Sequence, residues 1–389
     1  MKEAVIDIDQ RMINTLLLHS SFIDNLGLLN GKMGISIFFY HLARKTGNTI
    51  YEDYAGELID EIYEDINLNT PMDFANGLAG IGWGIEYLAQ NHFIEANTDE
   101  VLEETDKRLM QLIYHIPPDL GLCEGVIGLG TYLLMRIQNP AADDEKIQTL
   151  INRQLLVHLI SELDRRTQDV SDLIREPSPE HHDNDTSQEV KPDMKQGQPA
   201  TFDLTWDYPM LLAFLTEVFH LHLYNVKIKD ILQRLVHPLL RTENHPQLHS
   251  NRLLLGLALT KLNYENINPL EDELLNEQTT PNEFASNVEI EKTRQRLLSG
   301  INREIIVREL IPNYPFMKSG TAGISWVYSR LFDLTAEYQF QTEAHYWKKE
   351  SFKVEETNGL NIMHPIEEYS SILAILEGYA GLMLIDFLP

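Results

Sequence analysis

The stretch GLLNGKMGISIFFYHLARKTGN, from Gly27 to Asn48, decides how the chain folds. It places two glycines, Gly31 and Gly34, three residues apart in front of a long apolar run. Glycine inside a helix costs about 1 kcal/mol relative to alanine, so a glycine pair at a helix start needs a structural reason. If the pattern recurs along the chain, the fold is built from repeats.

The same pair of glycines does recur. With 21 glycines among 389 residues, chance would give about one Gly-x-x-Gly pair, but five occur, and each stands in front of an apolar run. Two of the runs also share Gly-Ile-x-Trp, starting at their second glycine. The first three pairs are 46 and 48 residues apart, which is the length of a helical repeat. The five pairs are Gly31/Gly34, Gly77/Gly80, Gly125/Gly128, Gly320/Gly323 and Gly378/Gly381.

Two further copies without the glycine pair fill the long gap between the third and fourth pairs. In FDLTWDYPMLLAFLTEVFHL, Asp207 and Met210 take the glycine positions. In SNRLLLGLALTKL, Leu253 and Gly256 take them, 46 residues further on. We therefore expect seven copies, with Asp207 and Leu253 beginning the fourth and fifth inner helices.

Residues 167–201 interrupt the spacing. These 35 residues are polar and contain prolines, and such a composition cannot bury an apolar face. Without them, the gap before the fourth copy returns to the length of a repeat. We therefore predict one domain over residues 1–389 that carries an exposed or disordered insertion at 167–201. Deleting the insertion should cost little stability, because loop-closure entropy grows slowly with length.

Helices of a different character lie between the glycine-led segments. In YEDYAGELIDEIYEDI, residues 51–66, apolar residues recur with the rhythm of a helix that buries one face. The glycine-led helices are apolar nearly all round, as helices covered on several sides are. Seven inner helices alternating with seven amphipathic outer helices predict an all-α fold, a closed α/α toroid. An open solenoid is the alternative, but it would want polar capping repeats at its ends.

The residues around each glycine pair are expected to shape the helix starts. Asn30, Asn76 and Ser319 precede a first glycine and are good N-caps. Glu124 and Glu377 occupy the same place, where a carboxylate favours the positive end of a helix. Glycine would let each turn take a positive φ and would let inner helices approach closely. In a toroid these turns meet at one mouth of the central cavity, where we expect the functional residues.

Composition and charge exclude several classes of protein. A net charge of −28 disfavours nucleic acid and anionic membrane surfaces as partners and favours a basic peptide or a small molecule. No apolar run reaches the roughly 18 residues of a membrane span. Cys123 is the single cysteine, which excludes a disulfide framework and favours a reducing compartment. We therefore expect a cytoplasmic protein.

The segments LLNGKMGI, GLAGIGWG and LEGYAGL resemble those of the LanC-like family, the lanthionine synthetase cyclases. The resemblance covers nearly the whole chain apart from the insertion. It implies a double ring of helices with Gly-x-x-Gly turns. It also implies maturation of a ribosomal peptide, in which cysteine thiols add across dehydrated serine or threonine to form thioether rings. In the family, a zinc ion held by Cys, Cys and His activates the thiol.

The positions that carry the family's chemistry hold other residues in this chain. The family's Trp-Cys-Tyr-Gly falls on residues 250–253, and its Cys-His-Gly falls on residues 318–320. Its His-Gly falls on Trp206 and Asp207, and the aspartate expected before the third glycine pair is Gly121. Because the chain has one cysteine, no shift of the alignment restores the ligands. We therefore expect no zinc cofactor and no zinc-dependent cyclase activity, which leaves open whether the protein is an enzyme.

Other candidates for metal or thiol chemistry carry little weight. The run HHDND at residues 181–185 lies in the predicted insertion, where solvated side chains are expected. His245 and His249 are four residues apart, but Pro246 between them disfavours the regular helix that such ligand spacing needs. Cys123 could face the cavity as a lone thiol, although a buried and inert cysteine is the commoner case.

Polar residues of mixed charge remain at the predicted mouth. Capping and solvation explain each of them as well as binding does, but together they would surround the cavity. Arg252 and Lys318 fall on or beside the family's zinc-ligand positions and suit a carboxylate or phosphate, which allows an anion-binding pocket. The candidate binding residues are Asn76, Glu124, Trp206, Asp207, Asn251, Arg252, Lys318, Ser319 and Glu377.

Three functions fit these observations. The first is an enzyme or enzyme-derived subunit in ribosomal peptide maturation that works without zinc. The second is a non-catalytic toroid that binds a peptide substrate or a peptide-modifying enzyme. The third is a carbohydrate-active enzyme of related six-hairpin architecture, with Glu124, Asp207 and Glu377 as candidates for two carboxyl groups about 5–10 Å apart. Seven repeats fit the LanC-like pattern better, so we favour a LanC-like protein associated with peptide modification.

Overall fold

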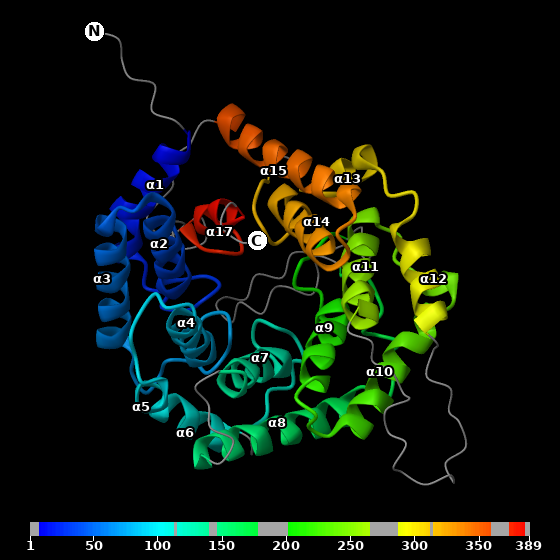
Figure 1. The fold of residues 1–389 in the computed structure, drawn as a ribbon, viewed down its shortest axis with the longest axis horizontal. Helices are drawn as coiled ribbons and strands as arrows, with labels where there is room; N and C mark the ends of the chain where they lie inside the picture. The colour runs from blue at the N-terminus through cyan, green and yellow to red at the C-terminus, as the bar shows by residue number, and fades with distance from the viewer. Residues whose placement is uncertain are drawn as a thin grey trace, which may run out of the picture.

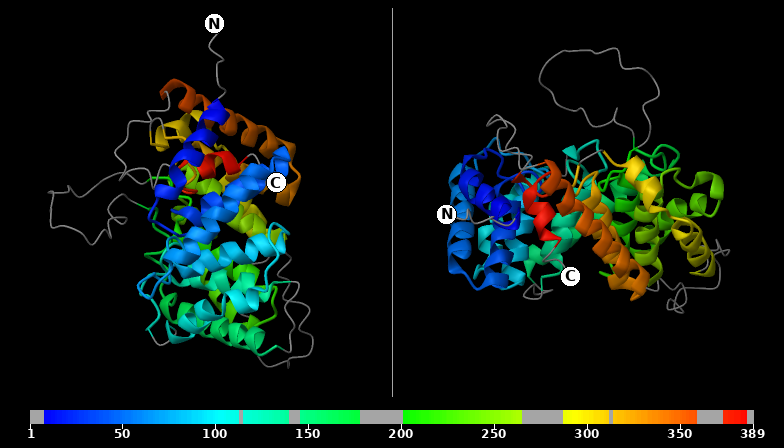
Figure 2. Two further views of the ribbon diagram at one scale, coloured as in Figure 1. Left: turned by 90° about the vertical axis from the view of Figure 1, so that its left-hand side faces the viewer. Right: turned by 90° about the horizontal axis from the view of Figure 1, so that it is seen from above.

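A computed structural model describes residues 8–112, 115–139, 146–177, 201–264, 287–311, 314–358 and 373–385. The described residues form helices and their connections, with no β-strand among them. The helices form two concentric rings (Figure 1). Seen from its sides, the molecule is flattened along the axis of the rings (Figure 2). The all-α fold predicted from the repeats is therefore confirmed.

The inner ring contains one helix from each predicted repeat. Each of these helices packs on the next as far as α14, and the last helix, α17, packs against α2 and closes the ring (Figure 1). The members are α2 (Lys32–Thr46), α4 (Leu78–Gln90), α7 (Val126–Ile137), α9 (Asp207–Phe219), α11 (His249–Tyr264), α14 (Thr321–Thr335) and α17 (Tyr379–Leu384).

The outer ring supplies one partner for each inner helix. In most cases the partner follows its inner helix in the chain, as α3 follows α2, but the partner of α17 is α1, from the opposite end of the described chain. Two of the seven outer positions hold a pair of shorter helices, α5 with α6 and α12 with α13. The outer helices are α1 (Ile8–His19), α3 (Thr49–Asp65), α5 (Thr98–Val101), α6 (Glu103–Leu112), α8 (Ile147–Arg166), α10 (Asn225–Leu239), α12 (Asn287–Leu298), α13 (Arg303–Glu309) and α15 (Tyr338–Asn358), and the short 3₁₀ helices are η1 (Ser20–Phe22) and η4 (Thr242–Asn244).

Burial follows the two patterns that the sequence predicts. Helix α3 buries Ala55, Leu58 and Ile62 on one face and leaves the rest of its surface to solvent or partly covered. Helix α4 buries nine of its 13 residues, because it is covered by α2, α7 and the outer pair α5 and α6. Within the described residues, no helix is both long enough and apolar enough to cross a membrane.

The glycine pairs act differently from the sequence-based expectation. Each first glycine is itself the N-cap of its inner helix, in extended backbone with φ between −106° and −145°, and no side chain caps the helix. The predicted N-caps Asn30, Asn76 and Ser319 are therefore wrong. So is the predicted positive φ, since the positive-φ glycines of the described chain are Gly47 and Gly300.

Close approach of two backbone segments is the physical reason for the glycines. The loop before an inner helix folds back over the first turn of that helix. The N–H groups of Lys32, Leu78 and Ala322 donate to carbonyls seven residues earlier, at 2.9, 2.9 and 3.0 Å. These bonds satisfy N–H groups that a helix start otherwise leaves without partners. A Cβ atom on the second glycine of a pair would meet the loop, for example at 2.0 Å from the Phe74 oxygen in the case of Gly80.

The loops are also joined to one another by backbone hydrogen bonds. The N–H of Leu29 donates to the carbonyl of Ala75, and that of Ala75 donates to Cys123, both at 2.9 Å. The N–H of Lys318 donates to Leu376 at 2.9 Å, and that of Leu376 donates to Leu29 at 3.3 Å. All five residues stand two positions before the first glycine of their repeats. The loops thus form a chain of hydrogen bonds around the inner ring.

The two repeats without glycine pairs behave differently from each other. Helix α9 begins at Asp207, as predicted. Helix α11 begins at His249 and not at Leu253, so the prediction for the fifth repeat is wrong by one turn. Without a glycine pair, no loop folds back over the start of α11, and the helix extends one turn further toward its N-terminus.

Two carboxylates replace the missing loop at the start of α11. Glu176 accepts from the N–H groups of residues 247 and 248, at 2.8 and 3.0 Å. Glu309, at the end of α13, accepts from those of residues 249 and 250, at 2.8 and 2.9 Å. Negative charge at the positive end of a helix is stabilising, so these contacts explain where the helix starts.

The predicted insertion is narrower than residues 167–201. Thr167 is fully buried, and Leu173 and Ile174 pack against the core. The carbonyl of Pro177 accepts from the N–H of Thr201 at 3.1 Å, so residues 177 and 201 lie side by side. Residues 178–200, which include the 181–185 run, lie outside the described residues, and for them the insertion stays a prediction.

The role of the second glycine can be tested by alanine substitution. Gly80→Ala should lower the free energy of unfolding by about 1–3 kcal/mol or more, because the new methyl group overlaps the Phe74 carbonyl and Leu28. Gly56→Ala in α3 is the control, since its Cβ would meet only the Tyr40 hydroxyl, at 3.9 Å. The control should raise stability by up to about 1 kcal/mol, because alanine favours helix. Denaturant unfolding measures both, and equal effects would refute the close-approach account.

Candidate functional site

The loops that precede the inner helices gather candidate residues on one edge of the ring, which we call the mouth. Lys318 Nζ lies 3.1 Å from Glu377 Oε1, so these two predicted residues form an ion pair. Cys123 lies within electrostatic reach of Lys318, Glu124 and Asp207. The structure therefore brings four of the nine predicted residues into one neighbourhood, around a cysteine that the sequence analysis weighed as inert.

This neighbourhood is acidic. Burial alone would lower the pKa of Lys318, but the carboxylates of Glu377 and Asp203 outweigh it and hold that pKa above its usual value. Lys318 is therefore a charged ammonium near the carboxylates of Glu377 and Asp203. Arg252 has its own contact, because its Nε donates to the Pro246 carbonyl at 2.8 Å. These surroundings favour a cationic ligand over the anionic ligand that the sequence analysis considered.

The Asp207 carboxylate occupies the place where the family's aspartate was expected. A Cβ on Gly121 would lie 2.7 Å from Asp207 Oδ1 and 2.9 Å from Asp119 Oδ1. Asp119 Oδ1 also accepts from the N–H of Gly121 at 2.5 Å. An acidic side chain from the fourth repeat thus fills the space that Gly121 leaves open in the third.

The Cys123 thiol is protonated at neutral pH. Burial raises the pKa of Cys123 to about 12; Lys318 opposes this rise, and the carboxylates of Asp203, Asp207 and Glu124 each add a smaller increase. Only the thiolate is a nucleophile or a metal ligand. Cys123 is therefore the inert thiol that was the commoner expectation.

Two of the predicted residues have structural roles in the described chain. Asn76 Oδ1 accepts from the side-chain amides of Asn25 and Asn30, at 2.8 and 3.0 Å, and so ties the first two loops together. Trp206 is only 6% exposed and stacks on Tyr208 in the core. Ser319 is half-buried.

Asn251 has polar contacts of its own. It is fully buried, and its Nδ2 donates to Glu176 Oε1 at 3.1 Å and to the Thr201 carbonyl at 3.3 Å. The N–H of Leu204 donates to the carbonyl of Lys318 at 2.8 Å. The segment 201–204 therefore contacts both the Asn251 side chain of the fifth repeat and the Lys318 backbone of the sixth.

These residues do not fit the family's zinc ion. Zinc in such a site takes thiolate and imidazole ligands, but the positions hold a buried amide, an ammonium and a hydroxyl. His249 accepts from the Asn302 N–H at 3.0 Å, and His245 contacts the Leu239 carbonyl, so the two histidines have separate partners. In the part of the chain that the structure describes, no three His, Cys, Asp or Glu side chains are placed to hold a metal ion.

Sequence reasoning missed several residues at the mouth. Asp203 is 3% exposed and accepts from the N–H of Thr205 at 2.8 Å, which fixes the turn before α9. Tyr314 lies near Glu377 and Asp203, and burial with these charges raises its pKa above its usual value. The sequence does contain a signal for Asp203. The family's aspartate is expected four residues before the first glycine of a repeat, and Asp203 stands four residues before Asp207, which takes that glycine's position in the fourth repeat.

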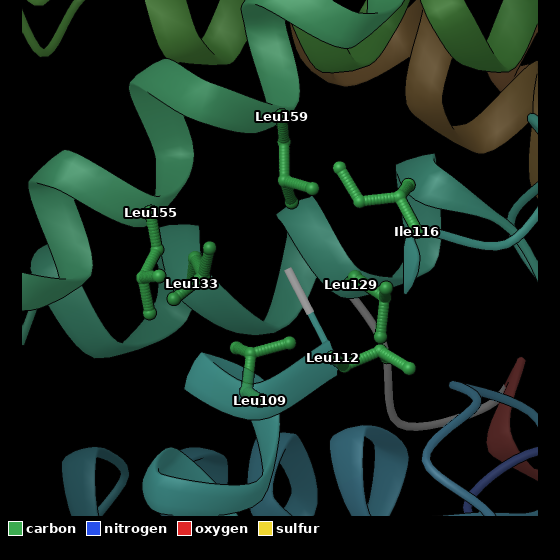
Figure 3. Close-up of a pocket in the computed structure, with 7 residues that line it drawn as sticks. All are labelled: Leu109, Leu112, Ile116, Leu129, Leu133, Leu155 and Leu159. Atoms are coloured by element: carbon green, nitrogen blue, oxygen red, sulfur yellow. The ribbon is translucent and has the colours of Figure 1, made fainter. Parts of the chain in front are cut away.

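A pocket elsewhere in the ring carries no candidate function. It lies between α6, α7 and α8, where aliphatic side chains converge (Figure 3). Binding sites usually add a few placed polar groups to an apolar lining, and this lining has none. Its residues are Leu109, Leu112, Ile116, Leu129, Leu133, Leu155 and Leu159.

The state of Cys123 can be measured by alkylation with iodoacetamide at pH 8. The folded protein should react roughly a thousandfold more slowly than the unfolded chain, because a pKa of about 12 leaves very little thiolate. Cys123 is the single cysteine, so mass spectrometry of the intact chain gives the rate without ambiguity. Alkylation of the folded protein at the unfolded rate would contradict the protonated thiol.

Comparison with known proteins agrees with the geometry. A family model described as lanthionine synthetase C-like protein matches residues 23–196, a range that contains the first three glycine pairs. No curated protein matches the chain. The match covers less than half of the chain, and it shows that this part of the chain, with its three glycine-led helix starts, is similar to the LanC-like family.

Proposed function

We propose that this LanC-like protein serves ribosomal peptide modification by binding a peptide substrate or a peptide-modifying enzyme at its mouth, without the family's zinc-dependent cyclase chemistry. The observation that carries the proposal is the Lys318–Glu377 ion pair at a position where the resemblance implies a zinc ligand. An ammonium there repels a metal cation, and the carboxylate beside it is already engaged.

The charge at the mouth supports a basic ligand. Glu377 balances the positive charge of Lys318, whereas Glu124, Asp203 and Asp207 add negative charge nearby. The whole chain carries a net charge of −28 and so attracts cations over a longer range. A peptide segment rich in lysine or arginine matches both features.

The chemistry of the mouth supports binding over catalysis. Thioether formation needs a thiolate, and among the described residues no three His, Cys, Asp or Glu side chains are placed to hold a metal ion that would activate a thiol. Cys123 is itself held as a thiol. The carbohydrate-active alternative was based on enzymes built from six helical hairpins. The inner ring of this protein has seven helices, so the number of repeats does not support that alternative.

The proposal predicts that a basic peptide binds at the mouth. Fluorescein-labelled octalysine should bind at low salt, lose affinity as salt is added, and bind far better than labelled octaglutamate. The double variant Glu124→Gln/Asp207→Asn should weaken octalysine binding at least about fivefold, because it removes two carboxylates at the mouth. Fluorescence anisotropy measures each affinity.

A matched control separates the mouth from the net charge. The double variant Glu57→Gln/Asp60→Asn removes the same two charges from the exposed face of α3. It should change the affinity less than about twofold, because surface charges beyond the Debye length are screened. Equal weakening by both variants, or no binding of octalysine at low salt, would refute a peptide site at the mouth.

A further inference from the structure

The Gly-Ile-x-Trp run that two repeats share places a tryptophan at the same point of two inner helices. Trp83 and Trp326 each stand six residues after the first glycine of their repeat, and we call this the sixth position. Both side chains are half-buried, although the residues directly before and after them in the chain are buried. A large apolar side chain that stays partly exposed within an otherwise covered helix points to a contact surface.

Trp83 faces the centre of the ring. A Cβ on Gly82 would meet Tyr132 of α7 at 2.7 Å, and a Cβ on Gly84 would meet Met33 of α2 at 2.6 Å. Successive helical residues are about 100° apart, so Trp83 points between these two neighbours of α4. The opposite face of α4 is buried and lies on the side of the outer helices α5 and α6 (Figure 1).

The same pattern of exposure recurs in other repeats. In the fourth repeat the sixth position is counted from Asp207, which takes the place of the first glycine. In four repeats this position is partly exposed and both of its neighbours in the chain are buried. The equivalent positions of a repeat fold occupy equivalent places, so these four side chains lie on the inner face of the ring. They are Trp83, Thr131, Ala213 and Trp326.

The sixth position holds an uncharged residue in all seven repeats. The other three are Ile37, Leu259 and Leu384, which are at most 5% exposed. Six residues of helix span roughly 9 Å, so this layer lies about that far below the loops of the mouth. In a chain with a net charge of −28, an uncharged layer thus lies beneath an acidic mouth.

Phe74 connects the mouth to this layer. Its N–H donates to the carbonyl of Cys123 at 3.0 Å, beside the exposed Glu124. Its ring meets the ring of Trp83 edge-on, with the centroids 6.1 Å apart. Trp83 in turn stacks on Tyr87, with the centroids 5.2 Å apart. Aromatic surface therefore continues from the mouth down the inner face of α4.

This aromatic surface is held in place by the neighbouring repeat. His41 Nε2, on α2, lies 2.8 Å from the Tyr87 hydroxyl, and the His41 ring packs edge-on against Phe93 at 4.8 Å. Burial, with a smaller effect of Arg44, lowers the pKa of His41, so the imidazole is neutral at pH 7. A surface whose side chains are already positioned loses less entropy when a ligand binds.

We propose that the sixth-position layer receives an aromatic side chain of the peptide whose basic residues the mouth binds, and that Trp83 is its main contact. This inference rests on the proposed function and names the substrate class more closely, as a peptide that combines basic residues with an aromatic one. An uncharged layer disfavours burial of a second lysine or arginine, because the charge would lose its hydration without gaining a partner. An aromatic ring gains from burial and from contact with the indole.

Two labelled peptides test the layer apart from the mouth. Each carries eight lysines and fluorescein, with one central residue that is phenylalanine in the first peptide and alanine in the second. The phenylalanine peptide should bind about tenfold more tightly, as burial of part of an aromatic side chain predicts. In Trp83→Ala this advantage should fall below about threefold, while the affinity for the alanine peptide changes less than about twofold. Fluorescence anisotropy on the full-length protein measures each affinity.

The fourth repeat already carries alanine at the sixth position, which makes Trp83→Ala a substitution that the ring has precedent for. If this variant does not fold, Trp83→Leu, which keeps apolar volume but no ring, should reduce the advantage of phenylalanine by a smaller factor. Tyr338→Ala is the matched control, because Tyr338 is an aromatic residue of the outer helix α15 and is 76% exposed. The control should keep the tenfold advantage.

The outcomes separate this inference from the proposed function. If both peptides bind equally well to the unmodified protein, the layer is not a binding surface, although the mouth still binds a basic peptide. An advantage of phenylalanine that survives in the Trp83 variants, or that Tyr338→Ala removes equally, also refutes the inference. If neither peptide binds at low salt, the proposed function is wrong and the inference is wrong with it.

Discussion

The ring depends on the close approach of a loop to the helix that follows it in the five repeats that carry a glycine pair. The loop carbonyls accept from the N–H groups of the first helical turn, as the Pro71 carbonyl does from Leu78, and glycine is required because a Cβ would overlap the loop. The same contact fixes the position of the loop relative to its helix. Residues at equivalent positions in neighbouring loops, such as Leu29 and Ala75, therefore form backbone hydrogen bonds that join the repeats. One local constraint therefore orders the inner ring and places the functional candidates on one edge.

The fifth repeat shows what happens where that constraint is missing. Its helix starts one turn early, at His249, and two carboxylates from distant parts of the chain take over the N–H groups of its first turn. Residues 201–204 contact the repeats on both sides: the Thr201 carbonyl accepts from Asn251, and the N–H of Leu204 donates to the carbonyl of Lys318. The positions that would share a zinc ion in the family hold an amide, an ammonium and a hydroxyl in this chain.

Much of the fold follows from the spacing of glycines and apolar residues alone. This spacing predicts the seven inner helices and the outer ring. It also predicts the start of α9 at Asp207, because the fourth repeat keeps the repeat length although it lacks the glycine pair. It could not predict the start of α11, since Glu176 and Glu309 are far from Leu253 in the chain. The acidic mouth was predicted only in part, because it depends on contacts between repeats, such as the Asp207 carboxylate beside Gly121.

Zinc content tests the central claim, that the fold keeps the family's ring but not its metal centre. The purified full-length protein is incubated with excess zinc, desalted and analysed for metal, and its melting temperature is measured with and without a chelator. The account predicts well below one zinc ion per chain and no change in melting temperature, because Asn251, Lys318 and Ser319 offer no thiolate or imidazole. One tightly bound zinc ion per chain, lost on substitution of Lys318 or Asn251, would contradict it.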